Sequence, residues 1–587
     1  MSARRRRPPG APRGHGARTG RWRVGLVMAA LALATAGVGL RVVLLQGEAE
    51  RDFLKRQGDA RTVRTLSIQA SRGVIHDRRG EPLAVSTPVL SVWANPQLFD
   101  AGPGKLEALA RRLGTKAGAL RSRIEEGRAR GLEFLYLRRR VPPAQAREIE
   151  ALELVGIEFQ EEYKRHYPAG EVSAHVVGIT NVDDEGLEGI ERAYDAWLAG
   201  SPGAKRVIRD RRGRVVRDLE YLRAAEPGRD LALSIDLRLQ YLAYRELKAA
   251  VGQYGARSGS VVVLDNRTGE VLAMVNQPSY NPNAPVTARF DRLRNRAVTD
   301  VYEPGSTVKP LTIAAALESG RFRADQVIDT SPGWVHLGGK TIKDPLDYGR
   351  LDLAGIIAKS SQVGISRIAL ELEEDPLRAV FARFGLGAPT GVEFPGEVAG
   401  RLPGAGPWPL IDRITFAFGY GLAVTPLQLA QAYTVFANGG AIGTPTLLRA
   451  EEDAPAPSLR PVLAPPIAER IAAMLEGVVR DEGTAARAAI PGYRVAGKTG
   501  TARKVTAGGY DDARHLAYFA GFAPASDPRV TAVVLINEPR SEDAGGGRVA
   551  APVFARVVGG ALRLLHVAPD VELAQRARGV AAAEPAG

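Results

Sequence analysis

Cysteine is absent from this chain of 587 residues. Its absence excludes disulfides, cysteine nucleophiles and thiolate zinc sites, although it leaves the redox compartment open. Histidine is scarce too, and the seven histidines show no H-x-x-x-H or other ligand spacing. We therefore expect no metal ion and no other cofactor, and any nucleophile must come from another residue type.

Acidic residues are absent from the first 23 positions, which hold eight arginines. These arginines supply more than half of the net charge of +14, and they lie among prolines and glycines. This composition predicts a disordered basic tail over residues 1–23. No basic stripe with interleaved aromatic residues follows elsewhere, so we expect no nucleic acid as a partner.

Long apolar runs are absent as well, with one exception at Val24–Leu45. A helix of these 22 residues would span about 33 Å, enough for a bilayer core of about 30 Å. The arginines before the run and the acids soon after it predict a cytoplasmic N-terminus and a body outside the cell membrane. A cleaved signal peptide is the alternative, because "ALALATA" offers small-x-small sites. The run continues well past those sites, which favours an uncleaved anchor at residues 24–45.

The rest of the chain is long enough for more than one domain, and a Pro-Gly break within Ala224–Asp230 marks a boundary. After the break, Ser258–Asn276 has the pattern of two apolar strands joined by "NRTGE", a hairpin. Strand patterns return in "YRVAGKTG" and "RVTAVVLINEP", with helical patterns between, which favours an antiparallel sheet covered by helices. Residues 567–587 look like a loose tail.

Ser306 and Lys309 form the only Ser-x-x-Lys pair, in "DVYEPGSTVKPLTIAAALESG". Pro304 and Gly305 predict a helix that begins at or near Ser306, with both side chains on one face and Cβ atoms about 5–6 Å apart. The apolar residues around Lys309 favour its burial, which lowers a lysine pKa and lets the neutral amine deprotonate a serine. For this pair alone, an N-capping serine with a surface lysine is the alternative.

Two more polar stretches add to this pair. In "VAGKTGTARK", Lys498 and Thr499 follow an apolar strand and precede Gly500. On an edge strand they would present a cation and a hydroxyl to a carboxylate, and glycine allows close approach of the backbone. In "KSSQVGISRIAL", the residues Ser360–Gln362 precede another helix. Each stretch alone is an ordinary turn, but the three in this order are specific.

In these motifs the chain resembles the class B penicillin-binding proteins of the division-specific FtsI type. The family's S-x-x-K box matches Ser306 and Lys309, its S-x-N box falls on Ser360–Gln362, and its K-T-G-T box matches Lys498–Thr501. "RNRAVTDVYEPGSTVKP", "FAFGYGLAVTPLQLAQAY", "RHYPAGEVSAHVVGITNVDDEGLEGIE" and "RGVIHDRRGEPLA" are similar too. The resemblance implies an α+β protein with a transmembrane helix and an extended mixed pedestal of the dimerisation type at residues 46–223. A transpeptidase domain at 224–566 would follow, with an antiparallel sheet covered by helices and an all-helical lobe.

The resemblance also implies a serine-type D-Ala-D-Ala transpeptidase with carboxypeptidase-like acyl chemistry. Ser306, deprotonated by Lys309, would attack the penultimate D-alanine carbonyl of a stem peptide, and a second stem's amine would take the acyl group. Backbone N–H groups of Ser306 and Thr501 would form the oxyanion hole, and Ser360 would relay a proton. The substrate-binding residues would be Gln362, Lys498, Thr499 and Gly500, with Lys498 also keeping Lys309 neutral by repulsion.

The implied setting is the inner membrane, with a single span and the bulk of the chain in the periplasm. Partners would be peptidoglycan stem peptides, the septal glycan polymerase and other division proteins, and β-lactams would inhibit. The chain departs from the family at Gln362, where asparagine is usual, so the amide is kept but displaced by a methylene.

Three alternatives to septal cross-linking stay open. An elongation-specific relative shares the same boxes, and a catalytically silent division scaffold is favoured only by Gln362. A β-lactam-sensing receptor would need several spans and a cytoplasmic signalling domain, and neither is visible in the sequence. A phosphate loop at "GGKT" is not expected, because Trp334 stands where the pattern needs glycine.

Overall fold

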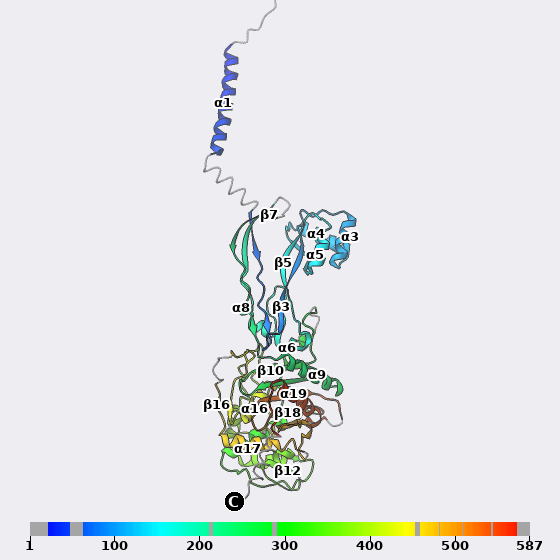
Figure 1. Ribbon diagram of the computed structural model, residues 1–587, viewed down its shortest axis with the longest axis vertical. Helices are drawn as coiled ribbons and strands as arrows, with labels where there is room; N and C mark the ends of the chain where they lie inside the picture. The colour runs from blue at the N-terminus through cyan, green and yellow to red at the C-terminus, as the bar shows by residue number, and fades with distance from the viewer. Residues whose placement is uncertain are drawn as a thin grey trace, which may run out of the picture.

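The structure is a computed structural model that describes residues 21–46, 63–209, 215–284, 290–337, 339–451, 458–480, 482–506, 509–541 and 544–571 (Figure 1). The apolar run of the sequence forms helix α1 (Arg21–Gln46). Within it, Arg21–Val43 is long and apolar enough to cross a membrane. Residues 1–20 and 572–587, which hold most of the two predicted tails, lie outside the described residues.

An elongated N-terminal part contains two sheets (Figure 1). The first is antiparallel and has the order β1 (Val63–Ile68), β6 (Gly203–Arg209), β7 (Val215–Arg223). The second has the order β4 (Leu135–Val141), β3 (Pro82–Ala94), β2 (Ile75–His76), β8 (Leu231–Ala232), and β5 (Ile157–His166) also pairs with β3. Because β8 follows the expected boundary at residues 223 and 224 yet joins this sheet, the exact boundary stays a prediction.

Helices complete this N-terminal part. Three of them share a small apolar core with β3 and β4: α3 (Pro103–Leu113), α4 (Ala117–Ala129) and α5 (Pro143–Glu150). The shorter ones are η1 (Gly170–Val172), α6 (Ala174–Val177), α7 (Gly189–Ala193) and α8 (Asp195–Leu198). This core is separate from the large one that fills the C-terminal part.

A buried ion-pair network ties the N-terminal part together. The Glu191 carboxylate accepts from Nε of Arg72 and from Nε of Arg165, each at 2.6 Å, and all three side chains are at most 1% exposed. A further ion pair, between Arg78 and Glu270 at 3.2 Å, links this part to the C-terminal part. Buried charges need such partners, because an unpaired charge in the interior is strongly destabilising.

The C-terminal part is built on a five-stranded antiparallel sheet. Its order is β10 (Val271–Gln277), β9 (Ser258–Asp265), β19 (Val530–Asn537), β18 (Gly509–Ala523), β17 (Ala496–Thr506). The predicted β9–β10 hairpin is confirmed, and so is the edge position of the strand with Lys498. Helices α9 (Leu237–Gln253) and α19 (Ala551–Leu564) pack on one face of the sheet, and α16 (Pro426–Ala437) packs on the other.

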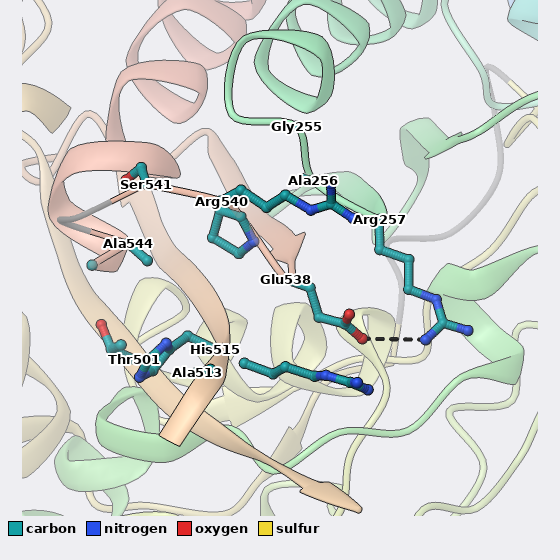
Figure 2. Close-up of a pocket in the computed structure, with 13 residues that line it drawn as sticks. Gly255, Ala256, Arg257, Thr501, Ala513, His515, Glu538, Arg540, Ser541 and Ala544 are labelled. Carbon is teal, nitrogen blue, oxygen red and sulfur yellow. Dashed lines mark hydrogen bonds and ion pairs between the residues drawn. The ribbon is translucent and has the colours of Figure 1, made fainter. Parts of the chain in front are cut away.

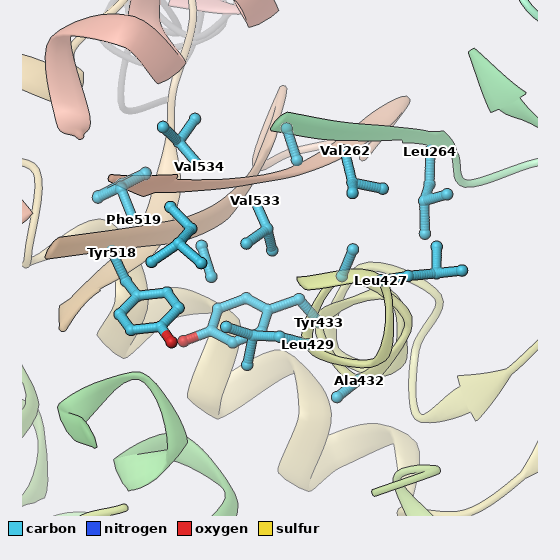
Figure 3. Close-up of a cluster of buried hydrophobic side chains, with 14 of the residues drawn as sticks. Val262, Leu264, Leu427, Leu429, Ala432, Tyr433, Tyr518, Phe519, Val533 and Val534 are labelled. Atoms are coloured by element: carbon cyan, nitrogen blue, oxygen red, sulfur yellow. The ribbon is translucent and has the colours of Figure 1, made fainter. Parts of the chain in front are cut away.

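Side chains of this sheet alternate between two buried faces (Figure 3). Phe519 and Val534 point to one face, where the Phe519 ring lies 4.6 Å from that of Phe554 on α19. Tyr518 and Val533 point to the other face, toward α16 (Figure 3). Because helices cover both faces, every residue of β19 is buried, and the strand reads as a continuous apolar run.

A helical lobe packs against α16 and β17. Its helices are α11 (Lys309–Glu318), α12 (Leu353–Lys359), α13 (Gln362–Glu371), α14 (Glu374–Arg383), α15 (Leu410–Phe416) and α17 (Pro465–Glu476). It carries two small ribbons, β11 (Ile328–Asp329) with β14 (Arg350–Leu351) and β12 (Trp334–Leu337) with β13 (Lys340–Lys343). The remaining short elements are η2 (Phe290–Arg292), α10 (Arg296–Thr299), η3 (Gly305–Val308), β15 (Ala441–Ile442), β16 (Arg460–Pro461), η4 (Ala486–Ala488) and α18 (Gly546–Val549).

Candidate active site

Ser306 lies in the 3-10 turn η3, and the α-helix α11 begins three residues later, at Lys309. The helix was expected at or near Ser306. Pro310 accounts for the later start, because proline is favoured in the first turn of an α-helix, where its missing N–H is not needed. Ser306 is half-buried among buried neighbours. Among the described residues its hydroxyl has no hydrogen bond, which leaves it free to meet a substrate.

Lys309 is fully buried, so the surface-lysine alternative is wrong. Its Nζ donates to the carbonyl oxygen of Ser360 at 2.5 Å and to Ser360 Oγ at 3.2 Å. Burial lowers the pKa of Lys309 to about 7, although the negative charge of Asp344 opposes the fall. A large fraction of the molecules therefore carry a neutral amine at pH 7, one turn from the Ser306 hydroxyl.

Ser360 ends helix α12 in the left-handed conformation, with φ at 58°. This conformation costs on the order of 1–2 kcal/mol for a residue with a side chain, so the surrounding contacts must hold it. The next residue, Ser361, caps helix α13 through a hydrogen bond from the Gly364 N–H at 2.8 Å. Between the two helices, both oxygens of Ser360 face the amine of Lys309.

Asp344 holds this loop in place, although no sequence pattern indicated this residue. Its Oδ2 accepts from Ser361 Oγ and its Oδ1 from the backbone N–H of Gln362, each at 2.5 Å. The carboxylate thus lies at the N-terminus of α13, where the helix dipole favours a negative charge. Asp344 therefore fixes the position of the loop and also acts electrostatically on Lys309.

Lys498 is a second fully buried lysine. Its Nζ donates to the Thr499 carbonyl oxygen at 3.2 Å and to Thr499 Oγ1 at 3.4 Å. Burial lowers the pKa of Lys498 well below its ordinary value, and the charge of Lys309 lowers it further. The repulsion between the two lysines thus lowers the pKa of Lys498, while the expected effect of Lys498 on Lys309 stays a prediction.

Strand β17 approaches the turn of Ser306 most closely at Gly500. A Cβ atom on Gly500 would lie 2.7 Å from Thr307 Cγ2 and 2.9 Å from the Pro304 carbonyl oxygen. Any larger residue would therefore push the strand away from the turn. On the same turn, a Cβ atom on Gly305 would lie 3.3 Å from the Thr501 carbonyl oxygen, so the turn also lies against Thr501. The sequence assigned the N–H groups of Ser306 and Thr501 to an oxyanion hole, and that assignment stays a prediction.

The hydroxyl of Tyr433 supports the same turn. This buried hydroxyl donates to the Thr307 carbonyl oxygen at 2.6 Å, from helix α16 (Figure 3). One turn along α11, Thr312 Oγ1 donates to the Ala417 carbonyl oxygen at 2.7 Å. These bonds join the start of α11 to distant segments, so the position of Ser306 depends on contacts that its own sequence stretch does not reveal.

A cavity of about 870 Å³, the donor-side cavity, opens between the lobe and the end of β17. Its lining includes Gln362, Arg401, Tyr420, Thr501 and Tyr510. Gln362 is bound to the fold through its backbone, while no hydrogen bond holds its side-chain amide among the described residues. The amide is therefore free to meet a ligand, and it makes no hydrogen bond to Lys309.

The arrangement supplies a hydroxyl nucleophile, a buried amine of lowered pKa, a second buried lysine and a tight backbone approach. These are the parts that acyl transfer through a serine ester needs. The structure brings every site residue expected from the sequence into this one region: Ser306, Lys309, Ser360, Gln362, Lys498, Thr499, Gly500 and Thr501. Their individual roles stay predictions. Asp344 and Tyr433 are the supporting residues that the sequence did not indicate.

Comparison with known families gives two matches. The penicillin binding protein transpeptidase domain matches residues 259–559, and the penicillin-binding protein dimerisation domain matches residues 67–233. The peptidoglycan D,D-transpeptidase FtsI of Escherichia coli is 44% identical over 557 residues, covering 94% of this chain and 93% of the relative. The probable peptidoglycan D,D-transpeptidase PbpC of Pseudomonas aeruginosa is 42% identical over 545 residues, covering 93% of this chain and 95% of the relative.

Solved structures agree with these matches. Penicillin binding protein 3 of Mycobacterium tuberculosis, complexed with aztreonam, is 28% identical with a TM-score of 0.66. The similarity covers 86% of this chain and 98% of that one. The transpeptidase domain of Burkholderia pseudomallei penicillin-binding protein 3 is 40% identical with a TM-score of 0.53, covering 57% of this chain and 97% of that one.

Proposed function

This chain belongs to the class B penicillin-binding proteins of the FtsI type, and from that premise we propose that it cross-links stem peptides at the division septum through an ester on Ser306. The enzyme class itself follows from the family: it is a serine-type peptidoglycan D,D-transpeptidase. The septal site of action and the roles of individual residues are the proposal.

In the first half-reaction, Lys309 takes the proton of Ser306, whose Oγ attacks the penultimate D-alanine carbonyl of the donor stem. The carbonyl oxygen becomes negative and is stabilised by the N–H groups of Ser306 and Thr501. The C–N bond then breaks, and Ser360 passes a proton from Lys309 to the departing D-alanine nitrogen. Its Oγ lies 3.2 Å from Lys309 Nζ, within reach for such a relay.

In the second half-reaction, an amine of the acceptor stem attacks the ester carbon. The C–Oγ bond breaks, the amine loses its proton toward Ser360 and Lys309, and Ser306 regains its hydroxyl proton. A peptide bond between the two stems remains, and no cofactor is needed for either step.

Lys498 and Thr499 would bind the donor's terminal carboxylate. Burial disfavours the charged form of Lys498, but an arriving carboxylate favours it. The restored charge on Lys498 then opposes protonation of Lys309. Substrate binding therefore helps to keep the base neutral, at the moment when Ser306 has to lose its proton.

The observation that carries this proposal is the burial of Lys309 beside Ser360, with a pKa of about 7. Keeping a lysine largely neutral in the interior costs stability, and a silent scaffold has no use for it. The unbound amide of Gln362 in the donor-side cavity can still serve the substrate, despite the change from asparagine. The observation thus argues against the scaffold alternative.

The setting follows from helix α1. The candidate span, with arginines before it and acids after it, supports a cytoplasmic N-terminus, with the remaining chain in the periplasm on the inner membrane. We propose the septal glycan polymerase and other division proteins as partners, peptidoglycan stem peptides as substrates and β-lactams as inhibitors that acylate Ser306.

Complementation of conditional division mutants tests the septal role. The full chain should restore septation in cells depleted of their division transpeptidase, and the Ser306→Ala variant should leave filaments although it is made and membrane-bound. Rescue of an elongation-specific mutant instead would assign the chain to the alternative pathway. Rescue of division by Ser306→Ala would show a scaffold role.

A further inference from the structure

A second hollow, here called the arginine cavity, lies beside the active site and has no place in the mechanism above. It measures about 1090 Å³ and is lined by the loop between α9 and β9, by Thr501 of β17, by part of β18 and by the segment after β19. Figure 2 shows Thr501 next to His515 on one side of it, with Arg257 and Arg540 on the other. Thr501 and His515 also line the donor-side cavity, so the two hollows meet at these residues.

The described lining of the arginine cavity is positively charged. Arg257, Arg514 and Arg540 line it, and Glu538 is the carboxylate among its described lining residues. Glu538 is shared between Arg257, at 3.3 Å, and Lys504. Arg514 pairs at 3.2 Å with Asp511, whereas the guanidinium of Arg540 has no partner among the described residues.

The backbone that carries Glu538 and Arg540 is held in place by hydrogen bonds. Glu538 has φ at 53°, a left-handed conformation that is strained for a residue with a side chain and that tends to occur at functional sites. Its backbone N–H donates to the His515 carbonyl oxygen at 2.8 Å, and the Arg540 N–H donates to the Tyr254 carbonyl oxygen at 2.7 Å. The segment that carries both charged side chains is thus anchored on two sides. Among the described lining residues three arginines face one glutamate, an excess of positive charge that suits a carboxylate.

A transpeptidase must hold two peptides, and their directions are set by the chemistry. The acceptor amine has to enter where the D-alanine nitrogen left, so the acceptor chain extends away from the acyl chain of the donor. On the proposed function, the acyl chain extends toward Gln362, whose free amide lines the donor-side cavity. The arginine cavity meets that cavity at Thr501 and His515, so it is the neighbouring hollow into which the acceptor can extend.

We propose that the arginine cavity is the acceptor subsite, in which Arg540 and Arg514 bind a carboxylate of the acceptor stem peptide. An acceptor stem is chemically a second donor, so it carries a terminal carboxylate at a distance from its side-chain amine. This assignment rests on the proposed function and adds to it the selection of the second substrate. The transfer itself stays as written above: the amine bonds to the ester carbon, the C–Oγ bond breaks and the proton returns to Ser306.

The test compares two acceptors that differ in one carboxylate. The full chain in detergent is given a small N-acyl-D-alanyl thioester as donor and, as acceptor, Nα-acetyl-lysyl-D-alanine or its C-terminal amide. The wild type should use the acid better than the amide, and Arg514→Gln with Arg540→Gln should reduce this preference about tenfold or more, the worth of at least one charge-assisted hydrogen bond. The control removes two exposed arginines of the N-terminal part instead, Arg121→Gln in helix α4 and Arg130→Gln directly after it, and should keep the preference.

Donor-side reactions separate this subsite from the proposed function. Acylation of the double variant by benzylpenicillin and by the thioester should match the wild type. A parallel loss of acylation and transfer would place the arginines on the donor, and an unchanged or absent preference for the acid would remove the subsite; both outcomes overturn the proposal. Failure of the wild type to be acylated at all would instead refute the proposed function.

Discussion

Acylation of Ser306 should slow below pH 7, because its base is Lys309. Burial lowers the pKa of Lys309 to about 7, and only the neutral amine can accept the serine proton. The neutral form disappears as the pH falls through this value. We therefore expect the second-order rate constant for acylation by benzylpenicillin to reach a plateau above about pH 8 and to fall about tenfold per pH unit well below pH 7.

The size of the effect follows from the two pKa values. At pH 7, an ordinary lysine with a pKa of 10.5 is neutral in about 0.03% of molecules, whereas a pKa of about 7 makes half of them neutral. Burial thus raises the active fraction roughly 1,500-fold, which corresponds to about 4 kcal/mol. Because the folded pKa lies below the unfolded one, the same lysine destabilises the fold at pH 7, and this cost declines as the pH rises toward 10.5.

The assay follows labelled benzylpenicillin on the full chain in detergent between pH 5.5 and 9. A Lys309→Met variant should show no acylation, yet its unfolding temperature at pH 7 should not fall, since a buried ionisable group has been removed. An acylation rate constant that does not change over this range would refute the role of Lys309 as the base. So would a rate constant that still rises tenfold per pH unit at pH 9, as expected for a lysine with the ordinary pKa.

Two further predictions concern residues that act through their neighbours. Asp344→Asn removes the charge that opposes the low pKa of Lys309, so the pH below which acylation slows should become lower. The maximal acylation rate constant should also fall, because the loop loses its anchor. If acylation slows at the same pH as in the wild type, the coupling is contradicted. Glu191→Gln leaves Arg165 buried without a carboxylate and Arg72 with Asp195 alone, which should cost about 3–5 kcal/mol in denaturant unfolding. A cost below about 1 kcal/mol would show that water or other groups compensate the two guanidiniums.

The sequence predicted those parts of the site that depend on short spacing. Ser306 and Lys309 lie one turn apart, and the edge strand with Lys498 has its own local pattern. The supporting contacts could not be predicted, because the partners are far apart in the chain. Asp344 binds a loop 17 residues away, and Tyr433 binds a carbonyl 126 residues away.

The same distinction holds for the fold. The hairpin of β9 and β10 was predicted, since a turn joins its two strands directly. The pairing of β9 with β19 is set by burial of both sheet faces and not by a turn, so no local pattern reveals it. The 3-10 turn before α11 was also missed, because its geometry depends on Tyr433 and on the close approach of Gly500.

Mass spectrometry of the acylated protein tests the central claim most directly. After treatment of the full chain with benzylpenicillin and proteolysis, we predict a single adduct on the peptide that contains Ser306, and none in the Ser306→Ala variant. An adduct on Ser360 or Ser361, or an adduct that persists in Ser306→Ala, would contradict the assignment of the nucleophile and with it the roles given to Lys309 and Ser360.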